Sequence, residues 1–349
     1  MIPDYFEKKL QENYVIYSGS MELTWRCNFK CIHCYQYPPS VAELKTEEVK
    51  DIIAQLADMG CLYLSLTGGE PLLRDDFWEI AAYAREKTFA LTLQTNGFLM
   101  TPEFVNRIKE LNFLDVDLSL LGARPETHDA ITGRPGSFKR VVRAIDLLRQ
   151  RNVNTNVKAT LMKQNFSEFK EIKALVENLD ANLIMSPLIY PVHRGESPES
   201  LRIDDENMRN YFSEMIPFEE IRESEEKVSK RSFLICQTGR TYCCINPEGK
   251  VYPCIMLPII VGDLRKKRLK EIWHDSPLPI LERVRSMTVS DLVDCADCAL
   301  ATKCNRCSAL SYLEEGDMSF PAHESCRTAR ILEEVISPWR KKESTASPK

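Results

Sequence analysis

The sequence predicts an α/β protein, a partial parallel barrel followed by a small cysteine-rich domain. From residue 20 to about 190, short apolar runs alternate with amphipathic runs, as in β–α–β units with parallel strands. A cysteine triplet follows the first apolar run, at the end of a strand where such barrels carry their chemistry. Nine further cysteines after residue 235 set the second domain apart from the barrel.

Six strands and five helices are expected in the barrel, which makes it a (β/α)6, TIM-like arrangement. Thr101-Pro102 indicates a helix start, since proline is favoured in the first turn. The expected strands are Met21–Thr24, Leu62–Leu66, Ala90–Gln94, Phe113–Leu118, Asn156–Leu161 and Leu183–Pro187. The expected helices lie at 46–59, 75–87, 102–111, 137–151 and 167–178.

Charge and composition place the domain boundaries. Residues 218–232 are dense in charge and predict a solvated helix or linker. An extension over 1–19 precedes the barrel domain of 20–217. The cysteine-rich domain, with a β-hairpin and a C-terminal helix, is expected over 233–340, and the polar tail at 341–349 is expected to be disordered.

Charge and hydropathy exclude several function classes. The formal net charge of −5 carries no polybasic signal for nucleic acid or an anionic membrane. No apolar run is long enough for a signal peptide or a membrane span. We therefore expect a cytoplasmic protein, in which thiols stay reduced. Thirteen cysteines there indicate metal clusters, with Cys61 as a small core residue.

The triplet Cys27, Cys31 and Cys34 has the spacing C-x3-C-x2-C. Three thiolates can hold a cubane iron–sulfur cluster and leave its fourth iron open to a small molecule. Two alternatives are a zinc site with His33 as the fourth ligand and a disulfide. Zinc is hindered because His33 and Cys34 are adjacent, and a disulfide needs an oxidising compartment.

The triplet and three later motifs together resemble the radical SAM superfamily. These motifs are LTGGEP at 66–71, QTNG at 94–97 and DLSLLG at 117–122. The resemblance implies that the triplet ligates a 4Fe–4S cluster and that S-adenosylmethionine (SAM) chelates the open iron. Reductive cleavage of SAM would then yield a 5′-deoxyadenosyl radical that abstracts hydrogen from a substrate.

The same resemblance implies which residues contact SAM. Glu70 would supply a carboxylate for the SAM ammonium, and the two glycines would let the backbone approach it. Asn96 and Ser119 would hydrogen-bond the ribose or carboxylate, and Tyr35 would lie near the adenine. Family members often place an arginine four residues after the histidine of an HD pair. Here His128-Asp129 is followed by Thr132, and Arg134 is the nearest substitute. The full implied set is Tyr35, Gly68, Gly69, Glu70, Pro71, Asn96, Ser119 and Arg134.

The C-terminal cysteines alone fit a zinc ribbon, but CQTGRTYCCINPEGKVYPC resembles the opening of the SPASM domain. That resemblance implies two auxiliary 4Fe–4S clusters, which makes three clusters in all. Adjacent strand residues face opposite ways, so Cys244 is an alternative to Cys243. Two residues separate Cys304 from Cys307, where family members usually have three. The implied ligands are Cys236, Cys243, Cys254 and Cys307 for the first cluster and Cys295, Cys298, Cys304 and Cys326 for the second.

Members of this family with auxiliary clusters include maturases of ribosomal peptides, and we expect a peptide or protein substrate. An electron donor such as flavodoxin or ferredoxin would be a second partner. Only about 20 residues precede the first strand, whereas many maturases begin with a leader-binding domain. The alternatives are an enzyme similar to sulfatase maturases, an enzyme that alters tetrapyrrole side chains, and a non-catalytic iron–sulfur or zinc scaffold.

Overall fold

A computed structural model describes residues 4–36, 42–191, 198–215 and 236–345. The charge-dense segment expected at 218–232 lies outside the described residues. Contacts divide the chain into two compact units, one of residues 1–201 with 237–285 and one of residues 202–236 with 286–349. Each unit is described separately below.

The first unit contains one nine-stranded sheet in the order β6-β5-β4-β3-β2-β1-β7-β8-β9. The six strands expected from the sequence are parallel to one another, which confirms the partial barrel. Their bounds are β1 Ser18–Glu22, β2 Tyr63–Thr67, β3 Ala90–Thr95, β4 Asp115–Ser119, β5 Thr155–Thr160 and β6 Asn182–Ser186.

The hairpin of the cysteine-rich segment continues the barrel sheet. Strand β7 (Tyr242–Ile245) pairs in parallel with β1, and β8 (Lys250–Tyr252) and β9 (Gly262–Asp263) follow in antiparallel register. Residues 237–285 therefore belong to the same compact unit as the barrel. The predicted domain boundaries stay a prediction. The pairing of β7 with β1 shows that the hairpin is continuous with the barrel sheet.

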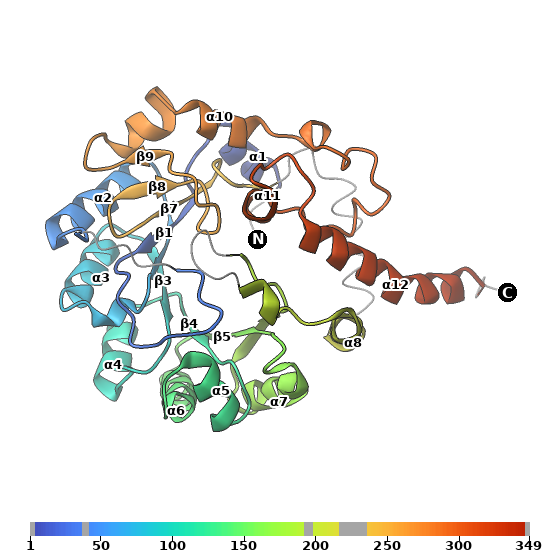
Figure 1. Cartoon of the computed structure of the whole chain (residues 1–349). Helices are drawn as coiled ribbons and strands as arrows, with labels where there is room; N and C mark the ends of the chain where they lie inside the picture. Colours follow the sequence, from blue (N-terminus) through green and yellow to red (C-terminus); the bar gives the residue numbers. More distant parts are fainter. Residues whose placement is uncertain (1–3, 37–41, 192–197, 216–235, 346–349) are drawn as a thin grey trace. The chain divides into compact units, whose positions relative to one another are not determined.

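Helices connect the parallel strands and lie along the outer side of the sheet (Figure 1). All five expected helices are present, and Thr101 caps α4 by accepting a hydrogen bond from the Phe104 N–H at 3.3 Å. Three α-helices of this unit were not expected from the sequence: α1 Asp4–Glu12, α5 Pro125–Thr132 and α10 Pro279–Ser286. The connecting helices are α2 Thr46–Asp58, α3 Phe77–Glu86, α4 Pro102–Glu110, α6 Ser137–Gln150 and α7 Phe169–Asn178. Short helical turns lie at Pro71–Leu73, Phe166–Glu168, Pro198–Leu201 and Glu271–Asp275.

Alternation along the strands gives the sheet two different faces. Leu91 and Leu93 of β3, like Val157 and Ala159 of β5, are almost fully buried against the helices. The intervening residues of both strands are half-buried, and most of them are polar. The core thus lies between sheet and helices, while the inner face of the barrel is polar.

The second unit is helical in its described part. It contains α8 Asp205–Met215, a short turn at Val289–Asp291, α11 Ser308–Glu315 and α12 His323–Thr345. Ion pairs join its helices, with Arg327 Nε 2.7 Å from an Asp205 oxygen. Residues 341–345, expected to be disordered, are the last turn of α12. None of the described helices of either unit is both long and apolar enough to cross a membrane.

Candidate functional site

A cavity of about 690 Å³ opens at the C-terminal ends of the barrel strands. Its lining comes from the loop after β1, from the ends of β2 to β5 and from the segment after β6. Most residues predicted to bind a cofactor are brought together there. They are Cys27, Cys31, Cys34, Tyr35, Gly68, Gly69, Asn96 and Ser119.

The three cysteines form one group around this cavity. Burial, together with smaller contributions from the neighbouring Cys34 and Cys27, raises the pKa of Cys31 to about 12. Among the described residues, no three His, Cys, Asp or Glu side chains converge on a single metal-ion position. Three thiols around one cavity fit the three cysteine ligands of an iron–sulfur cluster.

Hydrogen bonds from the protein reach the first of these sulfurs. The Phe29 N–H donates to Cys27 Sγ at 3.4 Å, and Asn96 Nδ2 lies 3.8 Å from it. Such donors stabilise a thiolate and tune the potential of a cluster bound to it. His33 also lines the cavity; burial lowers its pKa to about 4, and its Nδ1 is buried without a hydrogen-bond partner in the described part of the chain.

The cysteine loop is held in place by α5. The Lys30 N–H donates to Thr132 O at 2.9 Å, and the Ile32 N–H donates to Ile131 O at 3.0 Å. These two bonds use carbonyls that the end of the helix leaves unpaired. A helix that the strand–helix rhythm did not reveal therefore positions the predicted cluster ligands.

The two glycines after β2 are required by close packing against the segment that leads into the cysteine loop. A Cβ on Gly68 would lie 2.4 Å from Thr24 O, and one on Gly69 would lie 2.5 Å from Arg26 O. The Gly69 N–H donates to Thr24 O at 2.7 Å. The sequence argument gave these glycines a role toward the ligand alone, but here they first allow the two loops to lie in contact.

Glu70 ties the glycine loop to the end of β3. Its Oε2 accepts a hydrogen bond from the Asn96 N–H at 2.8 Å, and its Oε1 accepts one from Thr95 Oγ1 at 2.8 Å. The side chain is fully buried, and burial raises its pKa to about 7. Neither Glu70 nor the buried Pro71 is among the residues that line the cavity. The predicted contact between Glu70 and an ammonium stays a prediction.

Arg134 is not among the residues that line the cavity, and its predicted contact with SAM stays a prediction. Helix α5 ends at Thr132, and Gly133 turns the chain through a left-handed conformation (φ 63°). The Arg134 guanidinium consequently lies over the Phe98 ring, 4.9 Å from its centre. Thr132, rather than Arg134, lines the cavity.

The HD pair has local structural partners. His128 Nδ1 accepts a hydrogen bond from the Leu121 N–H at 3.0 Å, while burial lowers its pKa to about 4. Asp129 accepts hydrogen bonds from the N–H groups of Gly136 and Phe138 at the start of α6. The pair therefore fixes the geometry of α5 and α6 behind the cysteine loop.

Sequence reasoning missed three ionisable side chains on the inner face of the barrel. Asp117 and Lys158 line the cavity and form an ion pair with 2.6 Å between Nζ and Oδ2. Glu22, at the end of β1, accepts a hydrogen bond from Gln36, and burial raises its pKa to about 7. Charged residues at inward positions of β1, β4 and β5 were the available signal.

Cys243 and Cys244 face opposite sides of β7. Cys243 is fully buried, and its charge acts on Cys61, beside the helix layer. Burial raises the pKa of Cys244 well above the usual range, and the charges of Glu22 and Cys254 act in the same direction. Within this unit, Cys254 therefore shares surroundings with Cys244. Cys236 and Cys307, the other ligands implied for the first auxiliary cluster, belong to the second unit.

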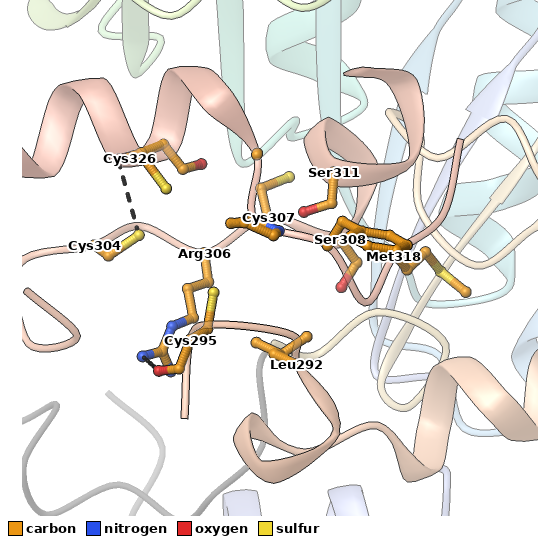
Figure 2. Close-up of a pocket in the computed structure, with 13 residues that line it drawn as sticks. Leu292, Cys295, Cys304, Arg306, Cys307, Ser308, Ser311, Met318 and Cys326 are labelled. Carbon is orange, nitrogen blue, oxygen red and sulfur yellow. Dashed lines mark hydrogen bonds between the residues drawn. The ribbon is translucent and has the colours of Figure 1, made fainter. Parts of the chain in front are cut away.

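A small cavity in the second unit is lined by four cysteines. Figure 2 shows Cys295, Cys304, Cys307 and Cys326 around it. Burial raises the pKa of Cys304 to about 11, with further contributions from the charges of Cys326, Cys295 and Cys298. Three of the lining cysteines are implied ligands of the second auxiliary cluster, and the fourth implied ligand, Cys298, lies within electrostatic reach of Cys304. Cys307, implied for the first auxiliary cluster, lines the same cavity. Soft thiolates grouped in this way fit a cluster.

Family models and curated relatives match most of this chain. The model of the radical SAM superfamily matches residues 21–176, and a model described as an iron–sulfur cluster-binding domain, SPASM, matches residues 236–308. An AdoMet-dependent heme synthase of Methanosarcina barkeri is 31% identical, over 85% of this chain and 92% of that protein. The mycofactocin maturase MftC of Mycolicibacterium smegmatis is 32% identical, over 74% of this chain and 70% of that protein.

Solved structures share the fold. Native anSMEcpe with bound AdoMet superposes with a TM-score of 0.75 at 17% identity, covering 94% of this chain and 99% of that chain. SuiB of Streptococcus suis bound to the precursor peptide SuiA superposes with a TM-score of 0.67 at 17% identity, covering 91% and 78%. At these identities the likeness establishes the fold alone.

Proposed function

The chain belongs to the radical SAM superfamily of enzymes, and we propose that it is a peptide maturase that uses SAM to abstract hydrogen from a peptide or protein substrate. One observation carries this proposal. Cys27, Cys31 and Cys34 meet the glycine loop at one cavity, at the C-terminal ends of the strands. That edge of a parallel barrel is where catalytic groups are placed. A non-catalytic scaffold is not retained, because the superfamily is one of enzymes.

The three cysteines are assigned as ligands of a 4Fe–4S cluster with one open iron for SAM. Bound there, SAM supplies a 5′-deoxyadenosyl radical after reductive cleavage, so the cofactor carries the difficult chemistry. The protein's own residues bind and orient. Asn96 and Ser119 are assigned to the polar groups of SAM and Tyr35 to its adenine, while the apolar wall of Leu188 and Ile189 excludes water from the cavity.

Two auxiliary 4Fe–4S clusters complete the proposal. Cys295, Cys298, Cys304 and Cys326 are assigned to one of them. For the other we assign Cys244 in place of Cys243, together with Cys236, Cys254 and Cys307. The shared surroundings of Cys244 and Cys254 support this choice. Auxiliary clusters suit a net oxidation, in which the substrate radical must lose an electron to an acceptor.

The peptide substrate is supported by the maturase among the relatives. A volume of about 690 Å³ is that of a site for one drug-sized ligand. SAM would occupy part of this volume, and the substrate would take the rest. The expected electron donor is a flavodoxin or ferredoxin, and the expected location is the cytoplasm, where thiols stay reduced.

A tetrapyrrole substrate is the second candidate, and one observation favours it. The match to the heme synthase of M. barkeri extends over 92% of that protein, against 70% for the mycofactocin maturase. The two candidates share the SAM chemistry and differ in substrate. A deuterated peptide and a deuterated tetrapyrrole, each incubated with enzyme and SAM, separate them by which one transfers label to 5′-deoxyadenosine.

The SAM reaction is tested with the anaerobically reconstituted full chain and dithionite. We expect conversion of SAM to 5′-deoxyadenosine and methionine. Cys31→Ala should abolish the reaction, whereas Cys61→Ala, a matched change at a buried cysteine outside the cavity, should leave it intact. A wild-type protein that binds zinc instead of iron and leaves SAM uncleaved would contradict the proposal.

A further inference from the structure

An ion pair on the inner face of the barrel has no role in the SAM chemistry described above. Lys158 of β5 and Asp117 of β4 both line the cavity, with Nζ and Oδ2 2.6 Å apart. Asn156 Nδ2 donates to the other oxygen, Oδ1 of Asp117, at 2.9 Å. Both oxygens of Asp117 are therefore engaged by neighbours on β5.

The pair presents its cation and hides its anion. The Lys158 side chain is 41% exposed, whereas that of Asp117 is 9% exposed. A lysine ammonium has three donors and no acceptor. Among the described residues, Asp117 is the only one whose side chain lies in ion-pair contact with Lys158. Asp115, also on β4, acts electrostatically on Lys158 without forming an ion pair with it, so N–H groups of the ammonium remain for an acceptor within the cavity.

Lys158 lines the cavity from β5, whereas the cysteine loop follows β1 and the glycine loop follows β2. In the sheet order, β5 is four strands away from β1. SAM chelated at the cysteine loop would occupy the β1 and β2 side with its methionine part. The ammonium of Lys158 is consequently placed for the molecule that enters beside SAM.

We propose that Lys158 binds a carboxylate of the substrate and so selects the residue that reacts. Asp117 is a positioning residue, because it holds the ammonium and leaves two N–H donors directed to the cavity. This inference rests on the proposed peptide substrate. It specifies that the modified residue of the peptide carries a side-chain or C-terminal carboxylate. A tetrapyrrole propionate offers the same chemistry and forms the second arm of the test.

The test measures binding to the reconstituted enzyme loaded with SAM. The peptide probes are N-acetyl-glutamate N-methylamide and its glutamine counterpart, which differ only in the carboxylate. The tetrapyrrole probes are coproporphyrin III and its tetramethyl ester. A charge-assisted hydrogen bond is worth about tenfold in affinity, so the wild type should prefer the glutamate probe by about tenfold. Lys158→Met and Lys158→Gln should remove the preference, while Lys158→Arg should keep it.

SAM affinity and the substrate-free formation of 5′-deoxyadenosine are measured in the same variants, so that an effect on SAM is distinguished from an effect on the substrate carboxylate. A fall in SAM affinity with an unchanged preference for the glutamate probe would assign Lys158 to SAM and overturn the proposal. An equal preference in wild type and Lys158→Met would also overturn it. A preference seen with coproporphyrin III alone, lost in Lys158→Met, would retain the carboxylate site and overturn the peptide substrate. Absence of SAM cleavage in every protein would reject the proposed function instead.

Discussion

Replacing Gly69 by alanine tests whether the glycine loop must lie in contact with the segment that precedes the cysteines. The added Cβ would meet Arg26 O at 2.5 Å and Trp25 O at 2.7 Å, both of them backbone atoms. Gly69 does not have a positive φ, unlike Gly68 at +136°. The substitution therefore probes steric contact without backbone strain.

The size of the effect follows from that contact. Ordinary contact begins near 3.4 Å, so the loop or the segment must move by about 0.9 Å. Overpacking of this kind costs about 1–3 kcal/mol of unfolding free energy. The displaced segment leads directly into Cys27, and an error of about 1 Å in a catalytic arrangement can cost about 100-fold in rate. We expect Gly69→Ala to lose SAM cleavage by about that factor.

The assay compares Gly69→Ala with Gly19→Ala, whose Cβ would find neighbours only at 3.7–3.8 Å. Chemical unfolding, bound iron and the rate of 5′-deoxyadenosine formation are measured on both. Gly19→Ala should resemble the wild type in all three. If Gly69→Ala matches Gly19→Ala in stability and rate, the close contact does not constrain the site and the reasoning is refuted.

Two further predictions concern the auxiliary ligands and the support of α6. Cys244→Ala should lower the bound iron from about 12 to about 8 atoms per chain, the content of two cubane clusters, whereas Cys243→Ala should retain about 12. If iron analysis gives the reverse order, Cys243 is the ligand. Burial alone raises the pKa of Asp129, but hydrogen bonds from Phe138, Gly136 and Ser137 outweigh it and hold the pKa below its usual range. A lowered folded-state pKa contributes stability above the unfolded-state pKa of about 3.9, which is lost as pH falls through the folded-state pKa. Asp129→Ala should therefore lower the free energy of unfolding by about 1 kcal/mol at pH 7. The difference from wild type, measured by urea unfolding, should shrink below a pH of about 4. A difference that does not change with pH would exclude the carboxylate as its source.

Local signals located most of the site. Cys27, Cys31 and Cys34 were recognisable from their spacing and context, and Gly68 and Gly69 from the family resemblance. Both groups reach the cavity because the C-terminal ends of parallel strands meet at one edge of the sheet. The placement of Arg134 could not be foreseen. It depends on where α5 ends and on the left-handed turn at Gly133, and a helix of eight residues gives little periodic signal.

The hydrogen-bond partners of buried groups could not be predicted from the sequence either. Glu70 bonds to Thr95 and Asn96, on a strand 25 residues further along the chain. The orientation of Cys243 and Cys244 was open because adjacent residues of a strand point to opposite faces of the sheet, and the sequence does not say which of the two faces inward. The pairing of β7 with β1 fixed that choice and joined the hairpin to the barrel.

By itself the sequence determined the strand–helix order and the cysteine motifs, because these depend on periodicity and spacing along the chain, and its motifs together resembled one family. Only the tertiary structure decided which face each strand turns inward and which distant side chains meet. It placed Lys158 beside Asp117, Cys244 within electrostatic reach of Cys254, and Arg134 over the Phe98 ring. Such contacts join residues far apart in sequence, and they are set by strand register and helix ends, which no local pattern encodes.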